Sequence, residues 1–328
     1  MNKHLFNTFS ILSILGLTVL GFAAFSDKGN DSDLSKNSYS SQVDIVFDNE
    51  ANKLEDTDFR NMDYMNLDFH NRELDKAVDY HDATKEDIFY MMLNTIFYYD
   101  KVSGTVMFQT DNPDVLYVDE FQCSLSDAQS YSCMSQRRIE DKNKIEVSSL
   151  SEPLYENIIY CNGIDRIDVF PMEKTYSAFN GGAVTLANVI RMPNENRLCI
   201  DDDGEHIFNM LTTPTNVFSA SMCIQPQEIT VGYLNNFDLW DVVDVITIDG
   251  RSYYIIHGEA EESYGARFGV SNFTFTVDTQ TGVIVKFEGC DVDGNINQFM
   301  YTENLKFEDE ASQVTLFNKN DYIDYLER

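Results

Sequence analysis

The sharpest feature of the chain is a change of hydrophobic period near residue 100. Apolar side chains recur at helical spacing from Ile88 to Tyr99, and Thr84 precedes this run with Asp87 three residues further on. A Thr followed at this distance by an acidic residue is typical of a helix N-terminus, where each side chain accepts the other's backbone N–H. The pattern therefore predicts one amphipathic helix from Thr84 to about Asp100.

Beyond residue 100 the period becomes two, which is the period of a strand. Apolar and polar residues alternate over 102–109 and again through most of 242–307. The second region contains Asp249-Gly250 and Asp293-Gly294, dipeptides that favour two-residue hairpin turns. We therefore expect an antiparallel meander with one apolar and one polar face, which is typical of a sheet covered on one side only.

Three further segments carry weaker patterns. Residues 154–200 repeat the alternation less regularly and are expected to add strands. Residues 203–240 mix Pro, Asn and short apolar clusters, so they are expected to hold short helices or a loop. Residues 311–328 form a C-terminal tail that a short helix would suit.

The amino terminus predicts export. An almost uncharged apolar run from Leu5 to Phe25 follows Lys3 and ends in small residues that suit cleavage by a signal peptidase. The run is also long enough to span a bilayer if it is retained. Residues 1–26 are therefore interpreted as a signal peptide or a membrane anchor, and either alternative gives an extracytoplasmic protein, secreted or membrane-anchored. Residues 27–83 are interpreted as an acidic flexible tether of uncertain structure.

Composition narrows the class of protein. The 328-residue chain carries 55 acidic and 23 basic side chains, a formal net charge of -32. It is also 43% hydrophobic and 13% aromatic. This apolar content fills a core, so a wholly disordered chain is excluded despite the charge. So acidic a surface repels phosphate backbones, and nucleic acid is excluded as a partner.

Six cysteines follow the apolar run, which permits up to three disulfides in an oxidising compartment and 15 complete pairings. Cys123 and Cys133 flank a polar stretch and suit a local loop staple. The alternative is that several cysteines are ordinary buried thiols. CxxC does not occur, so a thioredoxin-type motif or a zinc ribbon is not expected.

Motifs of enzymes and metal sites are missing from the sequence. The five histidines form no HExxH or HxH, and neither GxSxG nor GxGxxG occurs. Asp201–Gly204 and Asp291–Asn295 resemble calcium loops, but their Gly comes too early for the motif, so both are interpreted as hairpin turns. His257 is interpreted as an ordinary strand histidine. We expect no catalytic residue, no metal and no cofactor, and hence a protein that is not an enzyme.

Two stretches resemble a known family. The first is the helix at 84–99 with the strand Val102–Phe108, and the second is the end of the meander at Phe275–Glu288 and Tyr301–Phe307. Together they look like the half-barrel superfamily of the outer-membrane lipoprotein carrier (LolA-like) and the sigma-E regulatory protein (RseB/MucB-like), in a Gram-positive-type exported version. The resemblance covers residues 84–310, which it implies form one half-barrel domain.

The resemblance implies an α+β fold: a strongly curved antiparallel β-sheet, an open half-barrel, with a few helices packed in its concave face. It also implies an apolar cavity between helices and sheet. The candidate cavity residues are Val106, Phe108, Trp240, Phe273, Phe275, Val285 and Phe287. The alternative for each of them is an ordinary place in a closed core.

The function implied is that of an exported, non-enzymatic binding protein that shelters a hydrophobic ligand, such as a lipid, an acyl chain or a lipoprotein segment. The alternative is an envelope-stress regulatory or interaction domain that docks on a membrane protein. The expected partner is accordingly a hydrophobic ligand or lipoprotein, or a membrane-protein partner.

Overall fold

The computed structural model describes residues 65–66, 73–109, 112–141, 144–163, 165–179, 190–200, 206–211 and 216–325. The predicted leader, most of the predicted tether and the Asp201–Gly204 turn lie outside these residues. The described residues fall almost wholly in one compact unit, formed by Asp63–Leu198 and Phe208–Arg328. Within the described part of the chain, no helix has the length and apolar character needed to cross a membrane.

The helix predicted at Thr84 begins as expected. Thr84 is the N-cap of α2 (Lys85–Leu93), and the reciprocal bonds between Thr84 and Asp87 form a capping box. The α-helix ends earlier than predicted, at Leu93 with Asn94 as its C-cap, and a 3-10 turn, η1 (Thr95–Phe97), follows. The Thr95 hydroxyl donates to the carbonyl of Ile224 at 2.7 Å, so a tertiary hydrogen bond accompanies the tighter turn.

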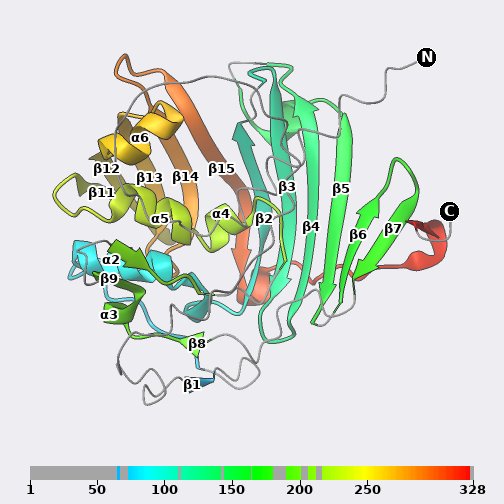
Figure 1. Cartoon of the computed structure of the whole chain (residues 1–328), viewed down its shortest axis with the longest axis horizontal. Coiled ribbons are helices and arrows are strands. Elements are labelled where there is room, and N and C mark those ends of the chain that lie inside the picture. Colours follow the sequence, from blue (N-terminus) through cyan, green and yellow to red (C-terminus); the bar gives the residue numbers. More distant parts are fainter. Residues whose placement is uncertain are drawn as a thin grey trace, which may run out of the picture. The chain divides into compact units, whose positions relative to one another are not determined.

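A large, unclosed sheet of twelve strands makes up most of the structure, with few helices, consistent with an open half-barrel (Figure 1). All neighbouring strands are antiparallel except the last pair, β7 and β16, which are parallel. The strands in their order across the sheet are β11 (Trp240–Ile248), β12 (Arg251–Glu259), β13 (Asn272–Asp278), β14 (Ile284–Cys290), β15 (Ile296–Phe307), β2 (Lys101–Gln109), β3 (Val115–Ser124), β4 (Gln129–Arg138), β5 (Tyr155–Asn162), β6 (Arg166–Phe170), β7 (Thr175–Phe179) and β16 (Ile323–Asp324).

The predicted hairpins are confirmed. Asp249 and Gly250 both have positive φ, 51° and 83°, as the turn between β11 and β12 requires. Gly294 has φ 83° in the turn between β14 and β15. The predicted meander therefore forms β11 to β15 in chain order, and it joins the N-terminal strands through pairing of β15 with β2.

The register sorts the side chains of the sheet onto two faces. One row runs directly across seven strands and is apolar at every position. Its members are Val242, Ile256, Phe275, Phe287, Met300, Phe108 and Tyr117. We call the side that carries this row the Phe275 face. The opposite side carries Tyr301 and its neighbours Met107 and Lys286, and we call it the Tyr301 face.

The N-terminal strands are covered on both sides, unlike the one-sided cover expected for the C-terminal meander. On the Tyr301 face, Met107, Leu116, Val118 and Leu150 form a buried hydrophobic cluster. Residues 139–141 and 144–150, which include η2 (Val147–Ser149), lie over this face and supply the cover.

The C-terminal segment also lies on this face. Phe317 contacts Tyr160 and Tyr176, with ring centroids 5.5 and 5.1 Å apart, and β16 pairs with β7. The predicted tail therefore holds a 3-10 turn, η5 (Lys319–Asp321), and a short strand.

Cys123 and Cys133 do not form the predicted staple. The thiols of Cys133, Cys161, Cys223 and Cys290 are free. Residues 115–138 form the β3–β4 hairpin rather than a loop, and Cys123 lies opposite Ser130 while Cys133 lies opposite Glu120. An odd offset along a strand turns a side chain to the other face, so the two thiols point to opposite sides of the sheet.

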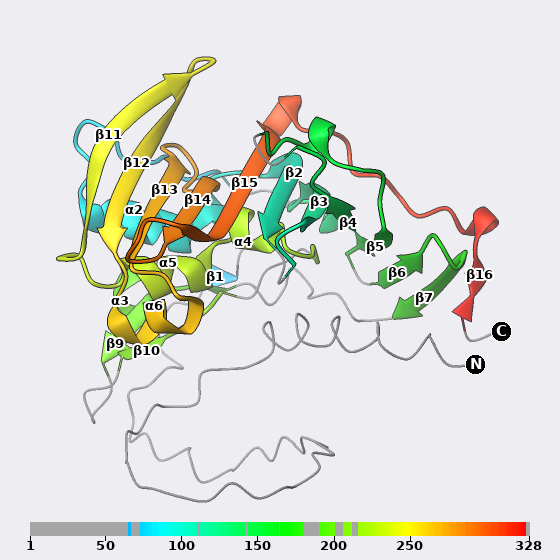
Figure 2. The same cartoon turned by 90° about the horizontal axis from the view of Figure 1, so that it is seen from above.

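Short elements connect and flank the sheet. Residues 203–240 contain two helices, as predicted, α4 (Ser221–Ile224) and α5 (Gln227–Leu234), which lie on the same side of the sheet (Figures 1 and 2). The other described elements are α3 (Asn194–Arg197), α6 (Glu262–Phe268), η4 (Glu308–Glu310), β1 (Met65–Asn66), β8 (Ile190–Arg191), β9 (Leu198–Ile200) and β10 (His206–Phe208).

Candidate functional site

An aromatic cluster marks the C-terminal half of the Phe275 face. Tyr233 of α5 contacts Phe273, Phe275 and Phe287, with ring centroids 5.0, 5.9 and 5.1 Å apart. Phe275 and Phe287 stack on each other at 4.7 Å. All four rings are buried, so three of the predicted cavity residues come together and a helical side chain fills the space above them.

Trp240 connects this cluster to the start of β11. Its indole N–H donates to the carbonyl of Leu234 at 3.0 Å, and its ring lies edge-on to Phe237. Because the indole is buried and its only donor is satisfied, Trp240 fixes the end of α5 against the sheet.

Val106 and Phe108 lie further along the same face, on β2. Val106 is fully buried, and Phe108 stacks on Tyr117 of β3 at 5.0 Å. Phe108 shares a register row with Phe287 through Met300. Six of the seven predicted residues therefore share one face of the sheet.

Val285 is the seventh residue, and it lies on the other face. Val277 pairs with Ile284, whereas Thr276 pairs with Lys286, so the register shifts by one residue at Val285. This β-bulge turns Ile284 to the buried side and leaves Val285 half-exposed beside Lys286. Strict alternation in the sequence assigned Val285 to the same face as Phe287, and the bulge breaks that alternation.

A polar seam crosses the N-terminal half of the Phe275 face. The Asp119 carboxylate is fully buried, accepts the Ser132 hydroxyl at 2.7 Å and accepts the backbone N–H of Ala220 at 2.8 Å. Ser132 in turn accepts the backbone N–H of Phe218. Burial raises the pKa of Asp119 to about 7, although these hydrogen bonds act in the opposite direction. Asp119 thus anchors the segment that enters α4.

The other end of α4 is held by two hydroxyl groups. Thr95 and Tyr99 both donate to the carbonyl of Ile224, at 2.7 and 3.0 Å. This carbonyl is the last of α4, a group that a helix leaves without an internal partner. The four-residue helix is therefore held by side-chain hydrogen bonds at both ends.

Arg197 joins three segments at the edge of the site. Its guanidinium is fully buried and donates to the carbonyls of Leu93 and Asn209 and to the side-chain oxygen of Gln227. Burial lowers the pKa of Arg197 to about 10, so the group keeps its charge at neutral pH. Gln227 opens α5, and Leu93 ends α2, so one cation fixes the spacing of the two helices.

Sequence reasoning missed Tyr233, Asp119 and Arg197. The spacing of Thr230, Tyr233 and Leu234 is helical and carried a signal for α5. Asp119 and Arg197 gave none, because a lone charged residue in sequence is normally exposed. Their partners lie in distant parts of the chain.

The predicted turn and histidine are placed as follows. The Asp291 side chain accepts the backbone N–H groups of Asp293 and Asn295, both at 2.9 Å, so this stretch is a hairpin turn as interpreted. His257 is exposed on β12 and lies 3.3 Å from the Thr274 hydroxyl. Among the described residues, no group of three or more His, Cys, Asp or Glu side chains is arranged to hold a metal ion.

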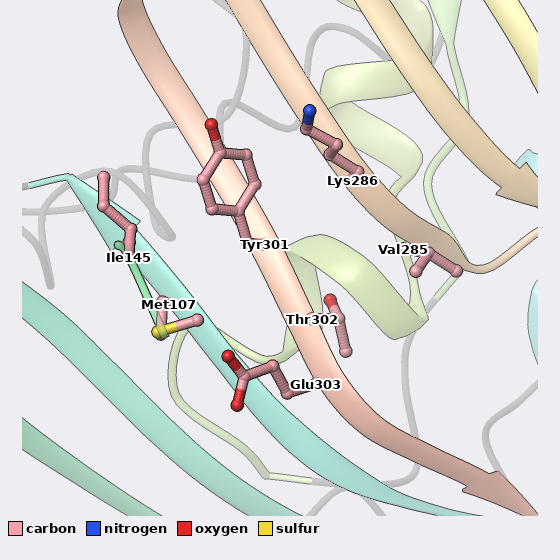
Figure 3. Close-up of a pocket in the computed structure, with 7 residues that line it drawn as sticks. All are labelled: Met107, Ile145, Val285, Lys286, Tyr301, Thr302 and Glu303. Atoms are coloured by element: carbon pink, nitrogen blue, oxygen red, sulfur yellow. The ribbon is translucent and has the colours of Figure 1, made fainter. Parts of the chain in front are cut away.

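Two surface hollows lie outside the Phe275 face. The first, on the Tyr301 face, has a volume of about 460 Å³ (Figure 3). Its lining residues are Met107, Ile145, Val285, Lys286, Tyr301, Thr302 and Glu303. The second has a volume of about 580 Å³ and lies beside the start of α6. Its lining residues are Leu239, Glu259, Ala260, Glu261, Glu262 and Ser263.

No protein-family model matches the chain, and no curated protein matches its sequence. Among solved structures, a chain of the Pseudomonas aeruginosa MucA/MucB complex is 10% identical with a TM-score of 0.32, over 71% of this chain and 64% of its own. A LolA-superfamily protein from Nitrosomonas europaea is 12% identical with a TM-score of 0.23, over 69% of this chain and 94% of its own. LprF from Mycobacterium bovis is 9% identical with a TM-score of 0.33, over 70% and 97%.

These comparisons carry no residue, ligand or partner over to this chain, because the identities and TM-scores are low. The chain spans about two thirds of the MucB-containing chain that it matches. The structures retrieved include MucB and a LolA-superfamily protein, the two kinds of protein whose sequence pattern this chain resembles.

Proposed function

We propose that the chain is an extracytoplasmic, non-enzymatic binding protein whose site is the Phe275 face beneath α4 and α5. In this proposal the sheet is the wall of a curved half-barrel spanning residues 84–310, and the helices occupy its concave side. The ligand is an apolar chain, such as a lipid acyl chain or a lipoprotein segment. The contact of Tyr233 with three phenylalanine rings of the sheet carries the proposal.

The physical argument is one of replacement. The Tyr233 ring covers Phe273, Phe275 and Phe287, and an acyl chain offers the same apolar contact without a polar group to satisfy. Each buried methylene contributes about 0.8 kcal/mol, so a dozen amount to on the order of 10 kcal/mol. A ligand of that size is able to displace one tyrosine ring and the short helix that carries it.

The hydrogen bonds at the two ends of α4 allow this helix to stay in place while α5 is displaced. Asp119 and the Thr95 and Tyr99 hydroxyls hold the two ends of α4 by hydrogen bonds, in addition to the burial of Ile224. We propose that α5 moves away from the sheet about this anchored segment, and that Val106 and Phe108 then extend the exposed apolar wall. Val285 has no part in the site, because it lies on the opposite face.

The test uses the purified full chain and the uncharged apolar fluorophore N-phenyl-1-naphthylamine. Replacing Tyr233 with Ala removes the ring that competes for the phenylalanine cluster, so we expect tighter binding of the fluorophore. Tyr301→Ala is the matched control, because it removes the same side chain from the other face. Mass spectrometry of solvent extracts from the unaltered protein is expected to find bound acyl species.

Two results would overturn this proposal. The first is fluorophore binding that Tyr233→Ala leaves unchanged, or that Tyr301→Ala alters equally, while thermal unfolding shows both variants folded. The second is the absence of acyl species from extracts of protein purified without detergent.

A second candidate function is a regulatory or interaction domain that docks on a membrane protein. The observation that favours it is that Tyr233 and Trp240 already fill the Phe275 face, so the fold is closed without any ligand. Chemical cross-linking in intact membranes, followed by identification of the attached protein, tests it. Recovery of one membrane protein in every preparation supports docking, and recovery of the chain uncrosslinked in every preparation contradicts it.

A further inference from the structure

Strand β11 forms an edge of the sheet. Within the described part of the chain it is the terminal strand in the sheet order and pairs with β12 alone. Figure 2 shows the β11–β12 hairpin extending beyond β13 and β14. On an edge strand, alternate residues direct their backbone N–H and C=O groups away from the sheet, where another extended chain can pair with them.

The side chains of this edge combine apolar and acidic groups. Val243 and Ile248 are 59% and 52% exposed, which is high for residues of their type. Asp241 and Asp244 are exposed on the same strand. A further strand at this edge would gain apolar contact, and its charges would have to be positive.

The chain itself places a cation at the start of this edge. The Lys85 ammonium group lies 2.6 Å from the Asp241 carboxylate and donates to the carbonyl of Phe237 at 2.9 Å. It also lies 5.4 Å from the centre of the Trp240 ring. These contacts show that the first residues of β11 accommodate an ammonium group.

An acidic hollow continues the edge. The second hollow, of about 580 Å³, is lined by Glu259, Glu261 and Glu262 together with Leu239. The backbone N–H of Glu259 donates to the carbonyl of Leu239 at 2.9 Å, directly before β11 begins. A side chain from a strand added at the edge therefore has a carboxylate-lined space within reach.

We propose that the β11 edge binds an extended basic peptide segment of another protein, which adds to the sheet as one more strand. A Lys or Arg side chain of that segment enters the hollow lined by Glu259, Glu261 and Glu262. Its other basic residues lie beside Asp241 and Asp244, and its apolar residues lie beside Val242 and Val245 on the other face of the strand. This inference goes beyond the ligand site on the Phe275 face and does not depend on it.

A second copy of the chain is a poor occupant of this edge. Pairing two β11 strands brings Asp241 and Asp244 of one copy close to the same residues of the other, and like charges across a strand pair repel. The net charge of -32 adds to this repulsion. The acidic side chains thus disfavour self-association at this edge and still allow a basic strand to bind there.

The test measures fluorescence anisotropy of dye-labelled ten-residue peptides with the full chain. The first peptide alternates Lys with Val, the second replaces Lys with Glu, and the third is the first with N-methyl groups on alternate residues. We expect only the first to bind. The third keeps the charge but loses the backbone hydrogen bonds of one edge, so it separates strand addition from electrostatic attraction.

Two variants test whether the first peptide binds at the β11 edge. Asp244→Lys is expected to weaken binding of the first peptide by on the order of tenfold, because a like charge then faces its lysines. Glu152→Lys makes the same charge change on an exposed residue away from the edge and is expected to leave binding unchanged. Equal binding of the N-methylated peptide, or equal effects of the two variants, would overturn the proposal. Analytical sedimentation gives a further contradicting outcome. The proposal is overturned if the unaltered chain sediments as a dimer and Asp244→Lys changes the stability of that dimer.

Discussion

The Asp119 carboxylate on β3 accepts the backbone N–H of Ala220 at 2.8 Å, and this bond anchors the entry to α4 on the sheet. No solvent reaches the carboxylate, so its proton uptake is coupled to the closed arrangement of the segment. The bond therefore links the covering of the Phe275 face to pH.

The first prediction concerns stability against pH. The pKa of Asp119 is raised by burial from 3.8 to about 7 in the folded chain. Between these values the unfolded chain has released the proton and the folded chain retains it. The contribution of this group to stability is therefore full below pH 4 and is lost as the pH rises to 7. The loss is on the order of 4 kcal/mol.

Chemical denaturation of the unaltered chain and of Asp119→Asn at several pH values measures this effect. From pH 4 to 7 the unfolding free energy of the unaltered chain is expected to fall relative to that of Asp119→Asn. Above pH 8 the difference between the two is expected to be constant. A difference that does not vary between pH 4 and 7 contradicts a raised pKa.

The second prediction concerns Arg197. Replacing it with Met leaves the carbonyls of Leu93 and Asn209 buried without their donor, so we expect a loss of about 3 kcal/mol in unfolding free energy. Arg138→Met is the matched control at an exposed position and is expected to change stability by less than about 0.5 kcal/mol. Urea denaturation compares the two, and equal losses would show that the buried hydrogen bonds contribute nothing.

The third prediction uses two glycines that both have positive φ. Gly282 has φ 75°, and a Cβ there would lie 2.8 Å from the backbone of Met91 in α2. Gly250 has φ 83° with no atom within 4 Å of such a Cβ. Both changes to Ala incur about 1–2 kcal/mol of backbone strain, and Gly282→Ala is expected to lose a further 1–3 kcal/mol or so because α2 must shift. Thermal unfolding of both variants under one buffer measures the difference, and identical melting temperatures would argue against contact between this turn and α2.

The fourth prediction tests the bulge in β14. Ile284→Ala empties a buried position and is expected to cost about 2–4 kcal/mol, whereas Val285→Ala is expected to cost less than about 1 kcal/mol because its side chain is half-exposed. Guanidinium denaturation ranks the two. A larger loss for Val285→Ala than for Ile284→Ala would contradict the bulge and support the strict alternation that the sequence suggests.

Local patterns in the sequence predict the parts of the fold that local forces determine. The capping pair Thr84 and Asp87 and the turn at Asp249-Gly250 act through neighbouring residues, and the structure contains both. The apolar alternation around Phe275 likewise places six of the seven candidate residues on one face. The resemblance to a family supplied the sheet's open character, which alternation alone does not contain.

Strand β4 escaped prediction because most of its buried residues are serines. Ser130 and Ser132 lie at fully buried positions, and they are stable there because they bond to Asn216 and Phe218. A serine carries no hydrophobic signal, so its burial depends on a partner that the local sequence does not show. The same holds for Asp119 and Arg197, whose partners come from distant segments.

The pairing of β15 with β2 has a consequence for how the protein folds as it emerges. Strands β2 to β7 and β11 to β15 each follow one another in sequence and form from neighbouring contacts, whereas the pair Met300 and Phe108 closes a loop of most of the chain. If the chain crosses a membrane amino terminus first, β2 emerges long before β15. Until residues 296–307 arrive, β2 is a bare apolar edge, and the half-made sheet is the species most exposed to aggregation or to capture by a chaperone.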